Sequence, residues 1–294
     1  MKRGQLQAIR RRVPKTGDPL GHLADSLHAN WRRYLKRLKR CRAKITKRAI
    51  HRSRVQTRRL FSQLDLLEGF IPANELKKAR RPLKRHHALF RDIRDTQVQL
   101  AIVDDSIGRF VGAPAFAGWL QRKEVRVGGK ARAALKRIKT KRLGQRLAAF
   151  EKKLMRCGRR MNKARASQML RTSVVRMFDR VVDLDRKVDG KQPRTIHRVR
   201  VALKRFVYMI EALPESISGM TDHRLRAMRD YIAKLGAIQD VEVLLGGLKK
   251  FARKPGSLKV SVDAMFMEFS RRREKLIQEY LQSRSELSRL KPAF

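Results

Sequence analysis

The sequence predicts an all-α protein built from two similar helical halves. Apolar residues recur at three- and four-residue steps over most of the chain, which is the spacing of one face of a helix. No run of alternating apolar and polar residues indicates a strand. Two short motifs occur twice, in the same order and at nearly the same separation, and this indicates an internal repeat.

The helical pattern follows a basic tail, residues 1–18. The first apolar stripe runs from Leu20 to Ile45 and the second from Ile50 to Leu67, before Gly69 and Pro72 interrupt the pattern. We expect a third helix that carries Leu76, Ala79, Leu83 and Phe90, and a fourth that begins near Asp95. Later helices are expected over residues 130–156, 163–187, 194–213, 222–236, 239–252 and 258–288.

Glycine and proline punctuate the segment from Asp105 to Lys130. Gly108, Gly112, Pro114, Gly118 and the pair Gly128-Gly129 all fall within it. Such residues favour turns over regular structure, so we expect loops and short pieces here.

The repeated motifs define the two halves. Residues 51–59 read HRSRVQTRR and residues 197–205 read HRVRVALKR, so both fit H-R-x-R-V-x-x-[RK]-R. Residues 93–98, IRDTQV, align with residues 238–243, IQDVEV. We therefore predict two pseudo-twofold-related helical bundles of about four to five helices each, residues 19–160 and 161–294. His51 should superpose on His197, and Asp95 on Asp240.

The charge is strongly unbalanced. Lysine and arginine number 74 against 26 acidic residues, a formal net charge of +48. Between Asp25 and Asp65 the chain has fourteen lysine or arginine residues and no acid. A solvated helix face normally mixes charge signs, because like charges one turn apart are destabilising. Unmixed rows predict an anionic partner.

The cations fall on defined helix faces. His51, Arg54 and Arg58 share one face, as do His197, Arg200 and Lys204, because positions i, i+3 and i+7 align on a helix. If such faces converge, they form a basic central groove suited to a linear chain of phosphates. The candidate contacts are Arg33, Arg37, Arg40, Lys44, Lys47, His51, Arg54, Arg58, Arg59, Lys84, His87, Arg91, His197, Arg200, Lys204, Arg205 and Arg229, the last as the counterpart of Lys84.

These motifs resemble the CHAD family, the conserved histidine α-helical domain, over about residues 19–290. The resemblance implies two four-helix bundles with a basic central surface that binds inorganic polyphosphate. It assigns the motif positions to His51, Arg54, Arg58 and Arg59, with His197, Arg200, Lys204 and Arg205. Members often accompany triphosphate-tunnel domains, which this sequence does not contain, and the irregular stretch 112–129 also departs from the pattern.

We therefore predict non-catalytic binding of inorganic polyphosphate, without a cofactor. A nucleic-acid-binding protein is the alternative, since backbone contacts alone give high affinity at this charge, although aromatic residues for base stacking make up only 6% of the chain. A polyphosphate-processing enzyme should show clustered carboxylates for magnesium, and the basic rows contain none. Asp95 and Asp240 are single acids, which we interpret as N-caps or arginine partners.

The role of the motif histidines has three candidate explanations. Each can donate a hydrogen bond to phosphate or to Asp95 or Asp240, or it can simply pack. Metal binding is disfavoured because the surroundings are cationic and lack further ligands.

The sequence also predicts the compartment. Cys41 and Cys157 lack metal-ligand or disulfide spacing, and neither a signal peptide nor an apolar membrane span is present. We expect a cytoplasmic protein with no membrane contact. Association with a storage granule or a polyphosphate-metabolising enzyme fits the same function.

Overall fold

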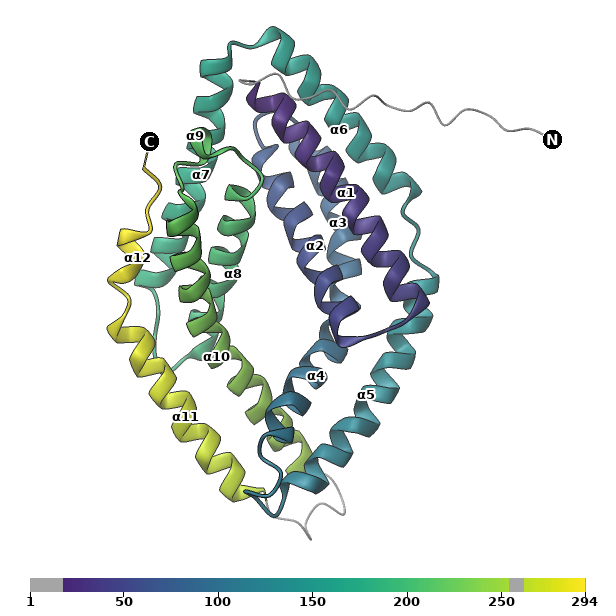
Figure 1. The fold of residues 1–294 in the computed structure, drawn as a ribbon, viewed down its shortest axis with the longest axis vertical. Helices are drawn as coiled ribbons and strands as arrows, with labels where there is room; N and C mark the ends of the chain where they lie inside the picture. The colour runs from purple at the N-terminus through teal and green to yellow at the C-terminus, as the bar shows by residue number, and fades with distance from the viewer. Residues whose placement is uncertain (1–17, 254–261, 294) are drawn as a thin grey trace, which may run out of the picture.

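The computed structural model describes residues 18–253 and 262–293 of the 294-residue chain, and within these ranges the regular structure is helical, without strands. The predicted tail, residues 1–18, lies outside this description except for Asp18. The helices are α1 (Pro19–Ala43), α2 (Lys47–Leu66), α3 (Ala73–Ala88), α4 (Arg91–Asp104), α5 (Ala113–Lys136), α6 (Lys141–Arg160), α7 (Lys163–Arg186), α8 (Pro193–Ile210), α9 (Glu215–Ser218), α10 (Asp222–Ala252), α11 (Asp263–Gln282) and α12 (Glu286–Arg289) (Figure 1).

Side-chain caps fix the starts of four long helices. Asp18 Oδ1 accepts a hydrogen bond from the backbone N–H of Leu20 at 3.1 Å and so caps α1. Thr46, Asn162 and Thr221 cap α2, α7 and α10 in the same way. These contacts satisfy backbone donors that have no partner within the helix, which explains why each helix begins where it does.

The expectation of loops between Asp105 and Lys130 is correct for residues 105–112, which form turns, but wrong from residue 113 onward. Helix α5 runs from Ala113 to Lys136 without a break, through all three of its glycines. A glycine inside a helix costs about 1 kcal/mol. Phe116, Trp119 and Leu120 bury their side chains in the core, and this burial outweighs the propensity penalty.

The helix expected over residues 130–156 is instead divided between α5 and α6, although the break carries no glycine or proline. Arg42, at the end of α1, donates hydrogen bonds to the carbonyl oxygens of Leu135 at 3.2 Å and Ile138 at 2.6 Å. The carbonyls at a helix C-terminus need such outside partners. A distant arginine therefore stabilises this break.

Three other helix boundaries differ from the prediction. The two helices expected over 222–236 and 239–252 are one continuous helix, α10. The fourth helix begins at Arg91, and Phe90 lies between α3 and α4. Of the helix expected over residues 258–288, residues 258–261 lie outside the described residues, and the remainder is divided between α11 and the short α12. Boundaries depend on tertiary contacts, which periodicity does not reveal.

The apolar residues form two cores. The larger joins α1, α2, α3 and α6 to α7, α8 and the N-terminal part of α10. The smaller joins α4 and α5 to the C-terminal part of α10 and to α11, at the lower end of the molecule in Figure 1. Both cores thus contain helices from both predicted halves.

The order of the helices nevertheless repeats. Helix α8 follows α7 as α2 follows α1, and the single helix α10 takes the place of α3 and α4 together. Helix α6, which packs along α1, has no comparable long helix after α11 within the described residues. The proposed division at residue 160 falls at the α6–α7 connection and stays a prediction. No helix in the described ranges combines the length and apolar composition needed to cross a membrane.

Candidate functional site

Helices α2 and α8 carry the repeated motif and pack against each other. Each helix buries one face: Ile50 and Leu60 of α2 and Ile196 and Phe206 of α8 are almost completely inaccessible. The faces with His51, Arg54 and Arg58, and with His197, Arg200 and Lys204, are turned away from these apolar stripes.

The two motif faces share one region of space. Burial, followed by the positive charges of Arg200 and Arg58, lowers the pKa of Lys204 to about 7. Burial also lowers the pKa of His51, as do Arg94, Arg58 and Lys204. Because charges on α2 reach Lys204, and Arg94 of α4 reaches Arg200 on the same helix as Lys204, residues from both halves face a common centre. We name this set the central cluster: His51, Arg54, Arg58, Arg94, His197, Arg200 and Lys204.

His87 and Arg91 adjoin the central cluster at the α3–α4 break. Arg54 Nη1 donates to the His87 backbone carbonyl at 3.2 Å. Burial, with Arg54 and Arg58 beside it, lowers the pKa of His87 to about 3, so the ring is neutral at pH 7. Burial and the neighbouring Arg58 likewise lower the pKa of Arg54 to about 10.

The cations of the central cluster are not neutralised by acids. Among the residues described, no carboxylate lies within 4.0 Å of a cluster cation. Asp95 and Asp240 lie farther off, and burial raises the pKa of each, while Arg54 and Arg200 respectively oppose that shift. Both acids lie inside helices, so their interpretation as N-caps is wrong, whereas that as arginine neighbours fits.

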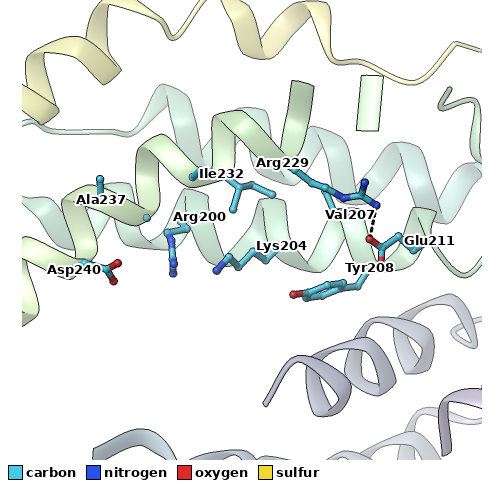
Figure 2. A pocket seen from close by; sticks show the side chains of 11 residues that line it. Arg200, Lys204, Val207, Tyr208, Glu211, Arg229, Ile232, Ala237 and Asp240 are labelled. Carbon is cyan, nitrogen blue, oxygen red and sulfur yellow. Dashed lines mark hydrogen bonds and ion pairs between the residues drawn. The ribbon is translucent and has the colours of Figure 1, made fainter. Parts of the chain in front are cut away.

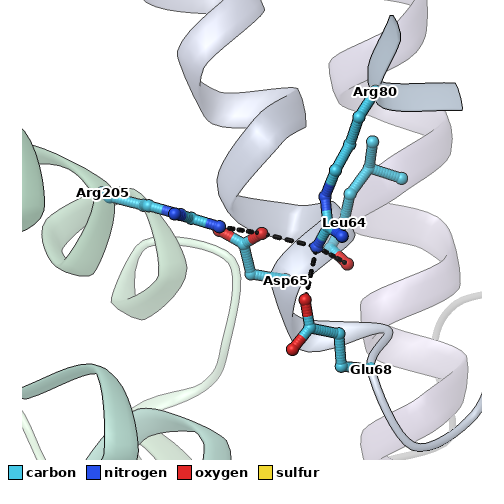
Figure 3. A network of polar contacts seen from close by, with 5 residues as sticks. All are labelled: Leu64, Asp65, Glu68, Arg80 and Arg205. Atoms are coloured by element: carbon cyan, nitrogen blue, oxygen red, sulfur yellow. Dashed lines mark hydrogen bonds and ion pairs between the residues drawn. The ribbon is translucent and has the colours of Figure 1, made fainter. Parts of the chain in front are cut away.

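The last arginine of each motif has a different environment. Arg59 Nη2 lies 2.9 Å from Glu211 Oε2, and Arg205 forms two hydrogen bonds with the carboxylate of Asp65 (Figure 3). In both cases an arginine of one motif helix pairs with an acid near the end of the other. We call these two contacts the reciprocal ion pairs. They follow the repeat, because residues 59 and 205, and residues 65 and 211, are both 146 positions apart.

Each acid of the reciprocal ion pairs binds a second arginine from its own half. Arg80 Nη2 lies 2.7 Å from Asp65 Oδ1, and Arg229 Nη2 lies 2.8 Å from Glu211 Oε1. Arg229 therefore corresponds to Arg80 by its contacts, rather than to Lys84 as the sequence indicated. Lys84 is exposed on α3.

The basic row of α1 lies apart from the central cluster. Desolvation lowers the pKa of Arg52, as do the neighbouring Arg48, Arg37 and Arg40, so this row faces a different side of α2. Arg33 donates to Asn30 Oδ1 at 3.5 Å. Lys44 is the C-cap of α1 and Lys47 begins α2. The predicted residues therefore lie on two separate basic surfaces, the central cluster and the row on α1.

The motif histidines make no hydrogen bond to Asp95 or Asp240 in the part of the chain that the structure describes. Burial, with Arg200 nearby, lowers the pKa of His197. Both histidines are therefore mostly neutral at pH 7 and can donate one ring N–H. No group of three or more histidine, cysteine or acidic side chains suited to a metal occurs among the described residues.

Sequence reasoning missed three residues of this region. Arg94 was part of a quoted motif but was not assigned a role. Tyr208 lies under the guanidinium of Arg59, 5.8 Å from ring centre to Cζ, and Glu211 holds two arginines. The recurrence of an acid six positions after each motif was a signal that could have identified Glu211 and Asp65.

Comparison with known proteins agrees with this architecture. The chain superposes on a structure titled PptA from Streptomyces chartreusis with a TM-score of 0.62 and 17% identity, covering 93% of this chain and 99% of that one. The crystal structure of the CHAD domain from the plant Ricinus communis gives 0.61 and 16%, covering 97% and 96%. No curated protein sequence matches. The profile of the CHAD domain matches residues 25–249, and the chain therefore belongs to the CHAD domain family.

Proposed function

We propose that this chain binds inorganic polyphosphate, without catalysis, through the central cluster. The observation that carries the proposal is the meeting of unpaired cations from both halves on α2, α4 and α8. Burial first, and then the charges of neighbouring cations, lower the pKa values of Arg54 and Lys204, so the protonated forms are both desolvated and repelled there. A polyanion relieves this repulsion, and its linear phosphates can contact both motif helices.

The placement of the acids supports a proposal of binding rather than hydrolysis. Asp95 and Asp240 belong to different helices, and each has an arginine of its own half as its main charged neighbour. The acids that act on each other, Asp92 and Asp95, lie three positions apart on α4, whereas only cations act on Asp240, so the two halves do not share the pair of acids that general acid/base hydrolysis uses. Arg59, Arg205 and Arg229 are excluded from the proposed contacts, because acids already hold them.

The test compares two variants that each lose four positive charges. The cluster variant replaces Arg54, Arg58, Arg200 and Lys204 with alanine. The control replaces Arg142, Lys152, Arg156 and Arg159, which are exposed on α6. Each lost charge-assisted hydrogen bond costs roughly 1.5–3 kcal/mol before non-additivity. We expect the cluster variant to lose at least about a hundredfold in affinity, and the control only a few-fold. Equal losses in the two folded variants would refute the assignment.

Nucleic acid is the second candidate, favoured by the net charge of +48. Competition at equal phosphate concentration and physiological salt separates the two ligands. Polyphosphate should displace duplex DNA, because a single phosphate chain can reach cations on two adjacent helices that a wide duplex contacts less closely. Equal competition would favour the nucleic-acid alternative. With this function we expect the protein to be cytoplasmic and to have granules or polyphosphate-metabolising enzymes as partners.

A further inference from the structure

A pocket beside the central cluster differs in character from the cluster itself. It lies between α8 and α10 and has a volume of about 540 Å³. Figure 2 shows Asp240 at one end, then Arg200 and Lys204, and finally Tyr208 with the Arg229–Glu211 pair at the other end. Ligand pockets usually measure about 300–1,000 Å³, so this one can hold a small molecule.

The remaining lining of the pocket is apolar or small, and consists of Val207, Ile232, Ala233, Gly236 and Ala237. A bare phosphate chain would use the cations of this pocket and leave that lining uncovered. A ligand with phosphates at one end and a flat, largely apolar group at the other would use both parts. The Tyr208 ring gives such a group a surface on which to stack.

The pocket departs from the repeat, and side-chain size explains the departure. Arg54 donates to the backbone of His87, while the guanidinium of Arg200 lies 3.4 Å from where a Cβ of Gly236 would be. Position 236 therefore corresponds to position 87. The separation of these two positions in the sequence is the same as the separation of Arg229 from Arg80. By that offset, Ala233 corresponds to Lys84. The second half has glycine and alanine where the first half has histidine and lysine, and this opens the pocket in the second half.

We propose that this pocket binds a nucleoside polyphosphate, with its phosphates on Arg200 and Lys204 and its base against Tyr208. The cations of one turn and the aromatic ring of the next lie on the same face of α8, so one ligand can contact both. Arg59 lies over the Tyr208 ring and pairs with Glu211, and these contacts hold the ring in place without filling the pocket. The inference shares Arg200 and Lys204 with the proposed function but needs the apolar lining as well.

The experiment compares ATP with tripolyphosphate, which has the same three phosphates and no base, without divalent cations. Stacking of a base on an aromatic side chain contributes roughly 1–3 kcal/mol, so ATP should bind at least about fivefold more tightly. Ala233→Leu should fill the pocket without changing any charge. It should bring ATP down to the affinity of tripolyphosphate and leave tripolyphosphate unchanged. Ala148→Leu, on the exposed face of α6, should change neither.

Three results would overturn the inference: equal binding of ATP and tripolyphosphate to the wild type, an ATP preference that Ala233→Leu leaves intact, or an equal loss of both ligands in that variant. Thermal unfolding of Ala233→Leu shows whether it is folded, and Ala237→Leu provides a second filling variant. Long-chain polyphosphate titrated into the same proteins keeps the two proposals apart. If it binds the wild type and Ala233→Leu alike while ATP shows no preference, only the nucleotide site fails.

Discussion

Arg58 and Arg59 are neighbours in the sequence but belong to two regions with opposite electrostatics. Arg58 belongs to the central cluster, where its charge acts on Arg200 and Lys204 and no acid lies within ion-pair distance among the described residues. Arg59 is turned about 100° around α2, and it pairs with Glu211 of the other motif helix. Lys204 and Arg205 differ in the same way on α8.

This contrast shows that the number of cations does not define the site. The site is defined instead by the positions of two acids, because Asp65 and Glu211 each form ion pairs with arginines from both halves. The reciprocal ion pairs then hold α2 and α8 together, and the cluster cations are left for an external anion. The four predictions that follow test this division of roles.

Replacing Asp65 by asparagine should have the largest effect on stability. The Asp65 side chain is only 5% exposed and contacts both Arg80 and Arg205, so its removal leaves Arg205 without its acidic partner and Arg80 with Glu68 alone. Breaking a buried ion pair costs about 3–5 kcal/mol. Urea denaturation should show a loss of that size, while polyphosphate affinity stays the same or rises with the added positive charge.

Asp183→Asn is the matched control, since Asp183 is 63% exposed and lies 3.9 Å from Arg186. It should change the free energy of unfolding by less than about 0.5 kcal/mol. A loss below 1 kcal/mol for Asp65→Asn would contradict a structural role for the reciprocal ion pairs.

Removing the arginines should cost less than removing the acid. Arg205→Ala leaves Asp65 paired with Arg80, and Arg59→Ala leaves Glu211 paired with Arg229. We expect a loss of about 2 kcal/mol for Arg205→Ala and about 1 kcal/mol for Arg59→Ala, since Glu211 is more exposed than Asp65. Arg198→Ala, exposed on α8, serves as the control and should be nearly neutral. Denaturation curves giving the reverse order would indicate that burial of the acid does not set the size of the effect.

Polyphosphate affinity should depend on pH through Lys204. Burial, Arg200 and Arg58 bring its pKa to about 7 in the free protein, and a bound phosphate raises it by favouring the charged form. Lys204 is already charged below pH 7, so affinity should fall as pH rises above 7, by up to about tenfold per unit. Lys204→Arg should flatten this part of the profile, because arginine stays protonated.

Calorimetry in buffers of different ionisation enthalpy gives a second reading of the same linkage. At pH 8 the wild type should take up more protons on binding than Lys204→Arg, by up to one. Identical proton uptake in the two proteins would mean that Lys204 does not titrate on binding.

The motif helices could be predicted from the sequence because several signals agree there. In α2 and α8 the apolar period, the cationic face and the repeat all specify the same helix. Helix α5 was missed because its glycines indicate a loop, whereas burial of Phe116 and Trp119 stabilises the helix. Local propensity is weaker than tertiary packing in such cases.

Only part of the candidate site could be predicted from the sequence, because its contacts also depend on tertiary packing. Periodicity places Arg58 and Lys204 on the same helix faces as the motif histidines, but it does not show which cation forms an ion pair with an acid of another helix. The pairing of Arg205 with Asp65 spans 140 residues and depends on how α2 and α8 cross. The pocket depends on Gly236 and Ala233, whose small size matters only beside α8.

The smallest expected change in stability gives the most direct comparison, because it concerns the adjacent residues Arg58 and Arg59. Arg58→Met removes a charge repelled by Arg200 and Lys204 but keeps a long side chain for packing. Like-charge pairs cost a few tenths of a kcal/mol each, so without polyanion this variant should gain about 0.5 kcal/mol of stability. Arg59→Met should instead lose stability, since Glu211 then keeps only Arg229. The gain should shrink as added salt screens the repulsion. Urea denaturation of both variants at low and high salt measures these changes, and shifts of the same sign would show that Arg58 and Arg59 do not differ in role.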